Sequence, residues 1–184
     1  MTQKIYGVGI IGCGLIGQKR SKSLGDEGRL IASADIDLVK AELLAKGFGA
    51  KPYSDWKDLL KLSEIDIVII ATLHDSLAEI TSAALKAGKH VLVEKPAARN
   101  VSEIENIISN LQNTGLKVRV GFNHRYHPAL IKAKFLVDIG ELGELMFIRS
   151  RYGHGARIGY DKEWRSDPVL SGGGELIDQG PHLI

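Results

Sequence analysis

An apolar, β-branched run near the start of the chain leads directly into three spaced glycines. Residues 5–11 form the run, and Gly12, Gly14 and Gly17 follow it before a helix-like stretch. A strand, a tight turn and a helix in this order are typical of dinucleotide-binding α/β sheets. Gly12 permits the sharp turn, Gly14 lets the backbone approach a pyrophosphate, and Gly17 allows the helix to pack closely on the strand.

The helix that follows Gly14 is expected to point its free backbone N–H groups at the ligand. Leu15 and Ile16 occupy its first turn, where unpaired donors and a partial positive charge attract an anion. Glycine also serves turns generally, but here the strand before the motif and the helix after it supply the required context. The predicted pyrophosphate site therefore comprises Gly12, Gly14, Leu15, Ile16 and Gly17.

Strand and helix patterns alternate as far as residue 122. Expected strands cover residues 5–11, 30–34, 65–72, 90–93 and 116–122; expected helices cover 38–44, a short segment capped by Ser54, 77–86 and 102–112. Strands separated by helices of this length require right-handed crossovers and a parallel sheet. We therefore expect an α/β fold with a doubly wound parallel sheet, a Rossmann domain over residues 1–123, and the start of a second domain over 124–184.

Asp35 stands at the end of the second expected strand, where a carboxylate can accept hydrogen bonds from the adenosine ribose. The alternative is a helix N-cap or a turn residue. A 2′-phosphate about 4 Å away would be repelled by several kcal/mol at an intermediate dielectric constant. No arginine follows, since the next residues are Ile36 and Asp37. The pattern favours NAD over NADP.

Two further sets of residues carry candidate chemistry. Lys95 follows the strand 90–93 at the carboxyl end of the sheet, where its ammonium could stabilise an alkoxide; the alternative is a solvated loop lysine. Asp178 and His182 are four residues apart, so one helix face could present both, and the carboxylate could orient the imidazole as a base; the alternative is an ordinary solvated face. Pro181 should kink that helix.

Several motifs together resemble one family. They are Gly12-x-Gly14-x-x-Gly17, Ala71-Thr72, Ala87-Gly88-Lys89-His90-Val91, Glu94-Lys95-Pro96, Gly121-Phe122-Asn123-x-Arg125, Trp164-Arg165 and Gly172-Gly173-Gly174-x-Leu176-x-Asp178-x-Gly180-x-His182. In this order they are similar to the Gfo/Idh/MocA family, the glucose-fructose oxidoreductase and inositol dehydrogenase group. The resemblance implies a second, α+β domain with an open, mainly antiparallel sheet that holds a sugar, cyclitol or nucleotide-sugar.

The resemblance also implies roles for individual residues. Lys95, Asp178 and His182 take the catalytic positions: His182 accepts the hydroxyl proton, Asp178 orients substrate and ring, and Lys95 tunes both while a nicotinamide accepts hydride. Cofactor contacts are implied for Thr72, Leu73, His74, Glu94, Lys95 and Asn123. After the fourth strand the family commonly reads Ala-Thr-Pro-Asn-x-x-His, and the proline and the histidine of this pattern are absent here. Leu73 and His74 are expected to border the dinucleotide through their backbone, without a side-chain role for His74.

The resemblance leaves more than one activity open. An NAD(P)-dependent oxidoreductase is the leading interpretation, and an NAD-dependent glycosidase of the same fold or a non-catalytic dinucleotide-sensing regulator are the alternatives. The joint presence of Lys95, Asp178 and His182 argues against the sensor, which needs only the dinucleotide cradle.

Composition excludes several other classes of function. The formal net charge is +2 with no long run of like charge, and no apolar stretch is long enough for a membrane span, so we expect neither nucleic acid nor membrane as a partner. The single cysteine, Cys13, lies between glycines and is expected to be a small packed residue. These features favour a cytoplasmic protein. His124 and His127 lack further ligands nearby, so no metal site is predicted.

The second half of the chain is expected to begin a sheet that it does not complete. A strand is predicted over residues 144–153, with Arg149 and Arg151 on one face followed by Arg157 and Arg165; this is a solvated face or a site for an anionic substrate. Its edges would be exposed. We therefore expect the chain to be truncated in its C-terminal domain, and the full-length protein to form a homo-oligomer.

Replacing the charge at Asp35 tests the cofactor prediction. Asp35→Asn should raise the affinity for NADP relative to NAD, because the carboxylate that repels a 2′-phosphate is gone. Parallel titrations with NAD and NADP give the ratio of the two dissociation constants. A ratio that stays as it is in the unchanged chain would contradict the assignment.

Overall fold

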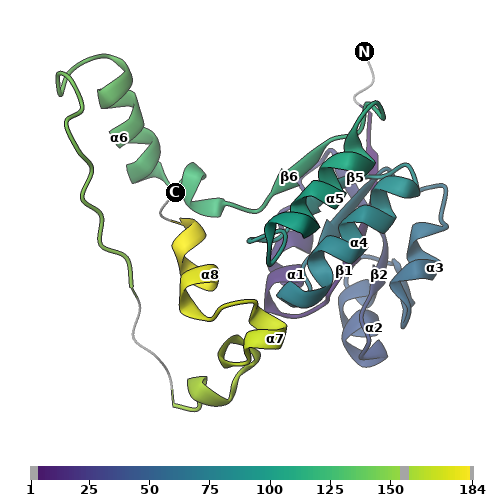
Figure 1. Cartoon of the computed structure of the whole chain (residues 1–184). Coiled ribbons are helices and arrows are strands. Elements are labelled where there is room, and N and C mark those ends of the chain that lie inside the picture. The colour runs from purple at the N-terminus through teal and green to yellow at the C-terminus, as the bar shows by residue number, and fades with distance from the viewer. Residues whose placement is uncertain (1–3, 154–157, 183–184) are drawn as a thin grey trace.

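The computed structural model describes residues 4–153 and 158–182 (Figure 1). Within them, six parallel strands form one sheet in the order β3-β2-β1-β4-β5-β6. The strands are β1 (Tyr6–Ile11), β2 (Gly28–Ala34), β3 (Lys51–Tyr53), β4 (Ile67–Ile70), β5 (His90–Val93) and β6 (Val118–Val120). The prediction of a doubly wound parallel sheet is confirmed.

Helices cover the sheet on two sides, and the alternation of side chains along each strand feeds two cores. Val8 and Ile10 of β1 are buried with residues of α2, whereas Ile11 is buried with residues of α3, α4 and α5. The helices are α1 (Leu15–Ser21), α2 (Leu38–Lys46), α3 (Trp56–Leu60), α4 (His74–Lys86) and α5 (Val101–Leu111). With both faces covered, the central strand β4 consists of apolar residues alone, and β1 is apolar from Gly7 to Ile11.

The sheet order reverses between β1 and β4, so the loops after these strands leave in opposite directions. The strands remain paired to their ends, where the Ala71 amide donates to the Ile11 carbonyl at 2.8 Å. Loops that diverge at such a point leave a crevice at the carboxyl edge, the usual ligand site of doubly wound sheets. This edge carries the glycine motif after β1 and Thr72, Leu73 and His74 after β4.

The three glycines of the motif have different steric surroundings. Gly12 has a φ of +90°, and a Cβ there would lie 2.5 Å from the Ala71 carbonyl oxygen. A Cβ on Gly17 would lie 2.0 Å from the Gly12 carbonyl oxygen, so α1 can approach β1 closely only with glycine at this position. A Cβ on Gly14 would meet nothing within 4 Å. Gly14 therefore borders open space, as a cradle for a ligand requires.

Local details differ from the sequence-based expectations. The short helix α3 is capped by Asp55, whose carboxylate accepts from the Lys57 amide at 2.9 Å, and not by Ser54. Asp55 is one residue nearer to the helix and has the stronger acceptor. Helix α4 begins at His74, three residues earlier than predicted, and the short edge strand β3 was not predicted.

The chain leaves the sheet after β6 through the 3₁₀ helix η1 (Asn123–Tyr126) and helix α6 (Pro128–Asp138). The sequence patterns did not predict α6, whose first turn is capped by His127 Nδ1, 3.2 Å from the Ala129 amide. Figure 1 shows α6 standing apart from the sheet. None of its residues is buried, so its packing surface is free in this chain.

The predicted strand over residues 144–153 is wrong for this structure. These residues have no strand assignment, and no other described segment lies beside them as a strand partner. A strand needs a partner for its backbone hydrogen bonds, so the β-like pattern here remains an extended segment. Met146, Phe147 and Ile148 are consequently 90%, 79% and 80% exposed. Arg157, on which part of the anionic-substrate hypothesis rests, lies outside the described residues.

The last segment is a series of short helices: η2 (Tyr160–Lys162), η3 (Trp164–Ser166), α7 (Pro168–Ser171), α8 (Glu175–Gln179) and η4 (Gly180–His182). The predicted helix with Asp178 and His182 on one face is therefore divided. Asp178 belongs to α8 and His182 to η4, and Pro181 lacks the backbone donor that would continue the α-helix. The segment docks on the sheet domain through Arg99, whose Nη1 donates to the Val169 carbonyl at 2.8 Å.

Across the described ranges, every helix is too short or too polar to cross a lipid bilayer.

Gly17→Ala should destabilise the fold, and Gly14→Ala should not. The added methyl group at position 17 meets the Gly12 carbonyl oxygen at 2.0 Å, and we expect a loss of about 3 kcal/mol in the free energy of unfolding. The methyl group at position 14 enters open space, so its effect should stay within about 0.5 kcal/mol. Urea denaturation of both variants makes the comparison; equal losses would contradict the packing role of Gly17.

Candidate active site

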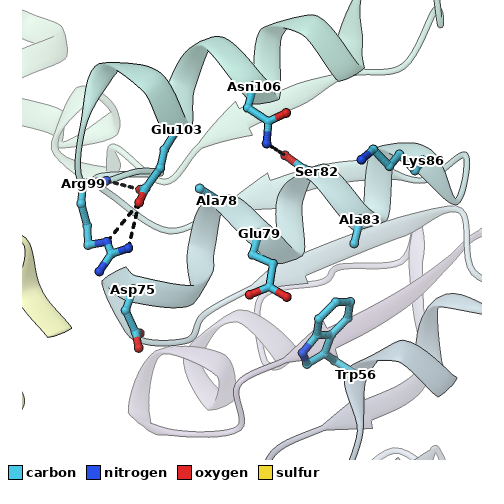
Figure 2. A pocket seen from close by; sticks show the side chains of 10 residues that line it. All are labelled: Trp56, Asp75, Ala78, Glu79, Ser82, Ala83, Lys86, Arg99, Glu103 and Asn106. Carbon is cyan, nitrogen blue, oxygen red and sulfur yellow. Dashed lines mark hydrogen bonds and ion pairs between the residues drawn. The ribbon is translucent and has the colours of Figure 1, made fainter. Parts of the chain in front are cut away.

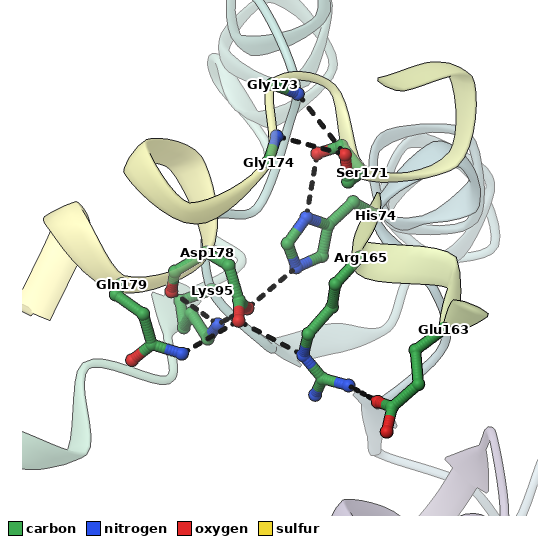
Figure 3. Close-up of polar contacts among 9 residues, drawn as sticks. All are labelled: His74, Lys95, Glu163, Arg165, Ser171, Gly173, Gly174, Asp178 and Gln179. Atoms are coloured by element: carbon green, nitrogen blue, oxygen red, sulfur yellow. Dashed lines mark hydrogen bonds and ion pairs between the residues drawn. The ribbon is translucent and has the colours of Figure 1, made fainter. Parts of the chain in front are cut away.

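A buried carboxylate joins the last helices to the sheet domain (Figure 3). The Asp178 side chain is 1% exposed, and its Oδ1 accepts a hydrogen bond from Lys95 Nζ, which also donates to the Asp178 carbonyl at 2.6 Å. Its Oδ2 accepts from Arg165 Nε at 3.1 Å and from Gln179 Nε2 at 2.7 Å. Both oxygens therefore have donors, and two cations offset the cost of burying the charge.

These contacts fix the charge state of Asp178. Burial alone would raise the pKa of the carboxyl group, but the hydrogen bond and positive charge of Lys95, together with the charge of Arg165, hold this pKa below its ordinary value. Asp178 is therefore ionised at neutral pH. Each partner reaches it from a different part of the chain: Lys95 lies two residues after β5, and Arg165 lies in η3. The Lys95–Pro96 peptide bond is cis.

Arg165 is itself held in place by its neighbours. Its guanidinium lies over the Trp164 ring at 4.5 Å from the ring centroid, and its Nη1 donates to Glu163 at 3.1 Å. Such stacking and the fork geometry of the group limit its freedom. The family motif Trp164-Arg165 thus supplies a donor to the site carboxylate, a role that the sequence analysis did not assign.

His74 contributes its side chain to this cluster. The ring is 3% exposed, and its Nδ1 lies 2.9 Å from the Ser171 carbonyl; because a carbonyl can only accept, Nδ1 carries the hydrogen. Its Nε2 lies 3.8 Å from Asp178 Oδ1. Burial lowers the pKa of His74, which favours the neutral ring. The expectation of a backbone role alone missed this contact between the loop after β4 and the segment that carries Asp178.

His182 lies in a different environment from the one predicted. Its ring stacks on His124 with centroids 4.1 Å apart and planes 26° apart, and the Tyr152 ring is 5.9 Å away. Its Nδ1 is buried and has no hydrogen-bond partner among the described residues. Burial lowers the pKa of His182, and His124 and Lys95 add to the effect while Asp178 opposes it. The aromatic neighbours orient this ring, and the Asp178 carboxylate is occupied elsewhere.

The glycine loop and Asp35 form one hydrogen-bonded unit. Asp35 Oδ2 accepts from the Cys13 amide at 2.8 Å, and its Oδ1 accepts from the Asp37 amide at 2.9 Å. Each carboxylate oxygen keeps a lone pair for a ribose hydroxyl. Cys13 is fully buried, and burial raises the pKa of its thiol to about 12, as expected of a packed residue. Leu15 and Ile16 begin α1 with exposed side chains.

The remaining predicted cofactor residues line the same edge. Glu94 is 8% exposed and accepts from Arg20 Nε at 2.7 Å, while Arg20 Nη2 donates to Asn123 Oδ1 at 2.8 Å. Glu94 and Asn123 are therefore tied to each other through Arg20, which the sequence analysis overlooked although it lies one turn beyond the glycine motif. Thr72 accepts from Ser76 Oγ at 2.9 Å, and Leu73 is 38% exposed.

A separate groove lies over α4 and α5 (Figure 2) and has a volume of about 430 Å³. On one wall, Arg99 donates to Glu103 from both Nε at 3.2 Å and Nη2 at 2.8 Å. None of the predicted site residues lines it. We therefore locate the candidate active site at the Lys95–Asp178 cluster.

The fold and this cluster define a dinucleotide-binding α/β protein. The chain belongs to the Gfo/Idh/MocA family: residues 6–122 match its oxidoreductase domain with the NAD-binding Rossmann fold, and residues 130–184 match a Gfo/Idh/MocA C-terminal domain. The resemblance stated from the motifs is confirmed.

Individual relatives are named as dehydrogenases. The chain is 30% identical to inositol 2-dehydrogenase of Salmonella paratyphi B, in a match that covers 78% of this chain. It is 31% identical to levoglucosan dehydrogenase of Pseudarthrobacter phenanthrenivorans, in a match that covers 96% of this chain. These matches cover 45% and 49% of the two relatives, so the chain spans about half their length. The crystal structure of an NAD-binding oxidoreductase from Klebsiella pneumoniae superposes with a TM-score of 0.79 at 30% identity, covering 97% of this chain and 51% of that one.

Asp178 should make stability depend on pH in acid. Its pKa is held below the ordinary value of 3.8 in the folded chain, so its contribution is complete above pH 3.8 and is lost as the pH falls through the folded pKa. Asp178→Asn should cost about 3 kcal/mol near neutral pH, because Lys95 and Arg165 lose a buried partner. Urea denaturation from about pH 6 down to about pH 2.5 should show this cost shrinking below pH 3.8.

The exposed pair of α6 provides the control. Lys134 donates to Asp138 at 2.7 Å, but the two side chains are 75% and 54% exposed, so Asp138→Asn should change stability by less than about 1 kcal/mol. A cost for Asp178→Asn that stays constant down to the lowest pH would contradict the ionised pair.

Proposed function

We propose that the whole protein is an NAD-dependent oxidoreductase that transfers hydride between the nicotinamide and a secondary alcohol of a sugar, cyclitol or nucleotide-sugar. The observation that carries the proposal is the buried Lys95–Asp178 pair, which stands at the same carboxyl edge of the sheet as the glycine cradle. The names of the inositol and levoglucosan dehydrogenases support the substrate class.

The residues at this edge fit a dinucleotide. The open space beside Gly14 admits a pyrophosphate, the first amides of α1 can donate to it, and the Asp35 carboxylate can accept from ribose hydroxyls. The carboxylate favours NAD over NADP. Thr72, Leu73, His74, Glu94 and Asn123 border the crevice on the other side. When bound, the nicotinamide supplies the acceptor or donor of hydride.

The chain's own residues handle the proton and the negative charge on the substrate oxygen. His182, neutral at neutral pH, takes the hydroxyl proton, and the Lys95 ammonium stabilises the alkoxide character that develops as the proton leaves. Asp178 holds Lys95 in one position through its carboxylate and its backbone carbonyl. A base and a fixed cation beside the same oxygen are what alcohol oxidation requires.

The cysteine content and the exposed apolar side chains bear on where the enzyme acts and whether it assembles. The single buried cysteine fits a cytoplasmic enzyme. The exposed apolar side chains of α6 and residues 144–153 fit a surface that is covered in the full-length protein, by the rest of its second domain and by further subunits.

Turnover by the full-length protein tests the proposal. A panel of sugars, cyclitols and nucleotide-sugars is assayed for NADH formation, and at least one should react. For that substrate, Lys95→Met should lower kcat by about 10²-fold to 10³-fold, because the charge on the developing alkoxide is no longer compensated. Lys86→Met, on the exposed end of α4, is the matched control and should leave kcat unchanged.

The pattern of results separates the alternatives. Tight binding of NAD without NADH formation from any alcohol would contradict the dehydrogenase and favour a dinucleotide sensor. Turnover of a glycoside with retained NAD and no net NADH would favour the glycosidase.

A further inference from the structure

His124 and Tyr152 form the aromatic environment of the His182 ring. His124, from η1, stacks face to face on the His182 ring at 4.1 Å. Tyr152, from the extended segment 144–153, packs its ring at 5.2 Å from His124 and at 5.9 Å from His182. Three aromatic rings from separate parts of the chain thus meet at the proposed base.

Hydrogen bonding does not explain how the His182 ring is held. A base histidine is usually oriented by an acceptor for its second ring nitrogen, but His182 Nδ1 is buried without a partner among the described residues. The nearby carboxylate of Asp178 is taken by Lys95, Arg165 and Gln179. The stack on His124 is therefore the contact that defines the plane of the ring.

We propose that His124 is a positioning residue for His182, and that its stacked imidazole fixes the plane of the base. The inference rests on the proposed role of His182 as the base. His124 does not touch the reacting atoms; it acts through the ring that does. The two histidines three residues apart thus differ in role, since His124 positions the base and His127 is the N-cap of α6.

The groups around His182 also act on its charge. His124 and the Lys95 ammonium both oppose a proton on this ring, and the Asp178 carboxylate favours one; the Tyr152 ring also faces it, with the ring centroids 5.9 Å apart. Because Asp178 is already paired with two cations, its pull on His182 is weakened. Neutral His182 is the form that can accept a proton from an alcohol.

Two substitutions test the proposal, one through the charge of His182 and one through the position of its ring. His124→Phe keeps an aromatic ring against His182 but removes the ring nitrogens, so the pKa of His182 should rise while its ring protons keep their upfield shift from the neighbouring ring. His124→Ala removes the ring, so the upfield shift should be lost as well. Both quantities are measured by NMR titration of the 184-residue chain, with His182→Ala used to assign the signals.

His127→Asn is the matched control. It removes an imidazole three residues away while keeping a side-chain acceptor for the first turn of α6, so the signals of His182 should not move. An unchanged His182 pKa in His124→Phe, with an unchanged ring-current shift in His124→Ala, would overturn the proposal. Neither measurement depends on turnover, so their failure is distinct from a failure of the dehydrogenase assignment.

Kinetics of the full-length enzyme supply a second readout. The acid limb of kcat/KM should move to higher pH in His124→Phe, because the base stays protonated to a higher pH. In His124→Ala the plateau of kcat/KM should also fall about tenfold, since the base is no longer held in place. A residue that served packing alone would leave the pH profile of His124→Phe where it is in the unchanged enzyme.

Discussion

The ion pair between Lys95 and the buried Asp178 is the interaction on which the candidate site depends. It brings together residues that are 83 positions apart in the sequence, one at the end of a sheet strand and one on a short helix. Arg165, Gln179 and His74 are arranged around the same carboxylate. A buried charge with fewer partners would be costly, so the cluster locks the last helices to the sheet edge where the dinucleotide crevice opens.

Much of the sheet domain was predictable, because the sequence patterns that indicate its strands and turns each lie within a few neighbouring residues. Apolar β-branched runs gave the strands, and the bounds of β5 were predicted as residues 90–93. The glycine motif located the crevice, and steric contacts at Gly12 and Gly17 explain why glycine is needed there. Errors occurred where the local signal was weak or shared, as in the three-residue strand β3 and the choice between Ser54 and Asp55 as a cap.

The sequence predicted which residues belong to the candidate site, but not which of them contact one another. Lys95, Asp178 and His182 were named from motifs and family resemblance, yet the helical spacing suggested that Asp178 would orient His182. The break at Gly180 and Pro181 turns His182 toward His124, and Asp178 instead binds cations that come from distant segments. Such long-range pairings, like that between Arg20 and Glu94, depend on tertiary structure and leave no periodic pattern in the sequence. The strand predicted over residues 144–153 was wrong for a related reason, since no described segment pairs with these residues.

The hydrogen bond from the Cys13 amide to Asp35 joins cofactor choice to loop shape. The same carboxylate that would meet the ribose also accepts a hydrogen bond from the turn between Gly12 and Gly14, at 2.8 Å from the Cys13 amide. Replacing Asp35 with a residue that tolerates a 2′-phosphate would therefore also remove the hydrogen bond that the glycine loop makes through the Cys13 amide. Such a switch needs a second change that offers the Cys13 amide a new acceptor, so cofactor preference in this fold is expected to evolve in coupled steps.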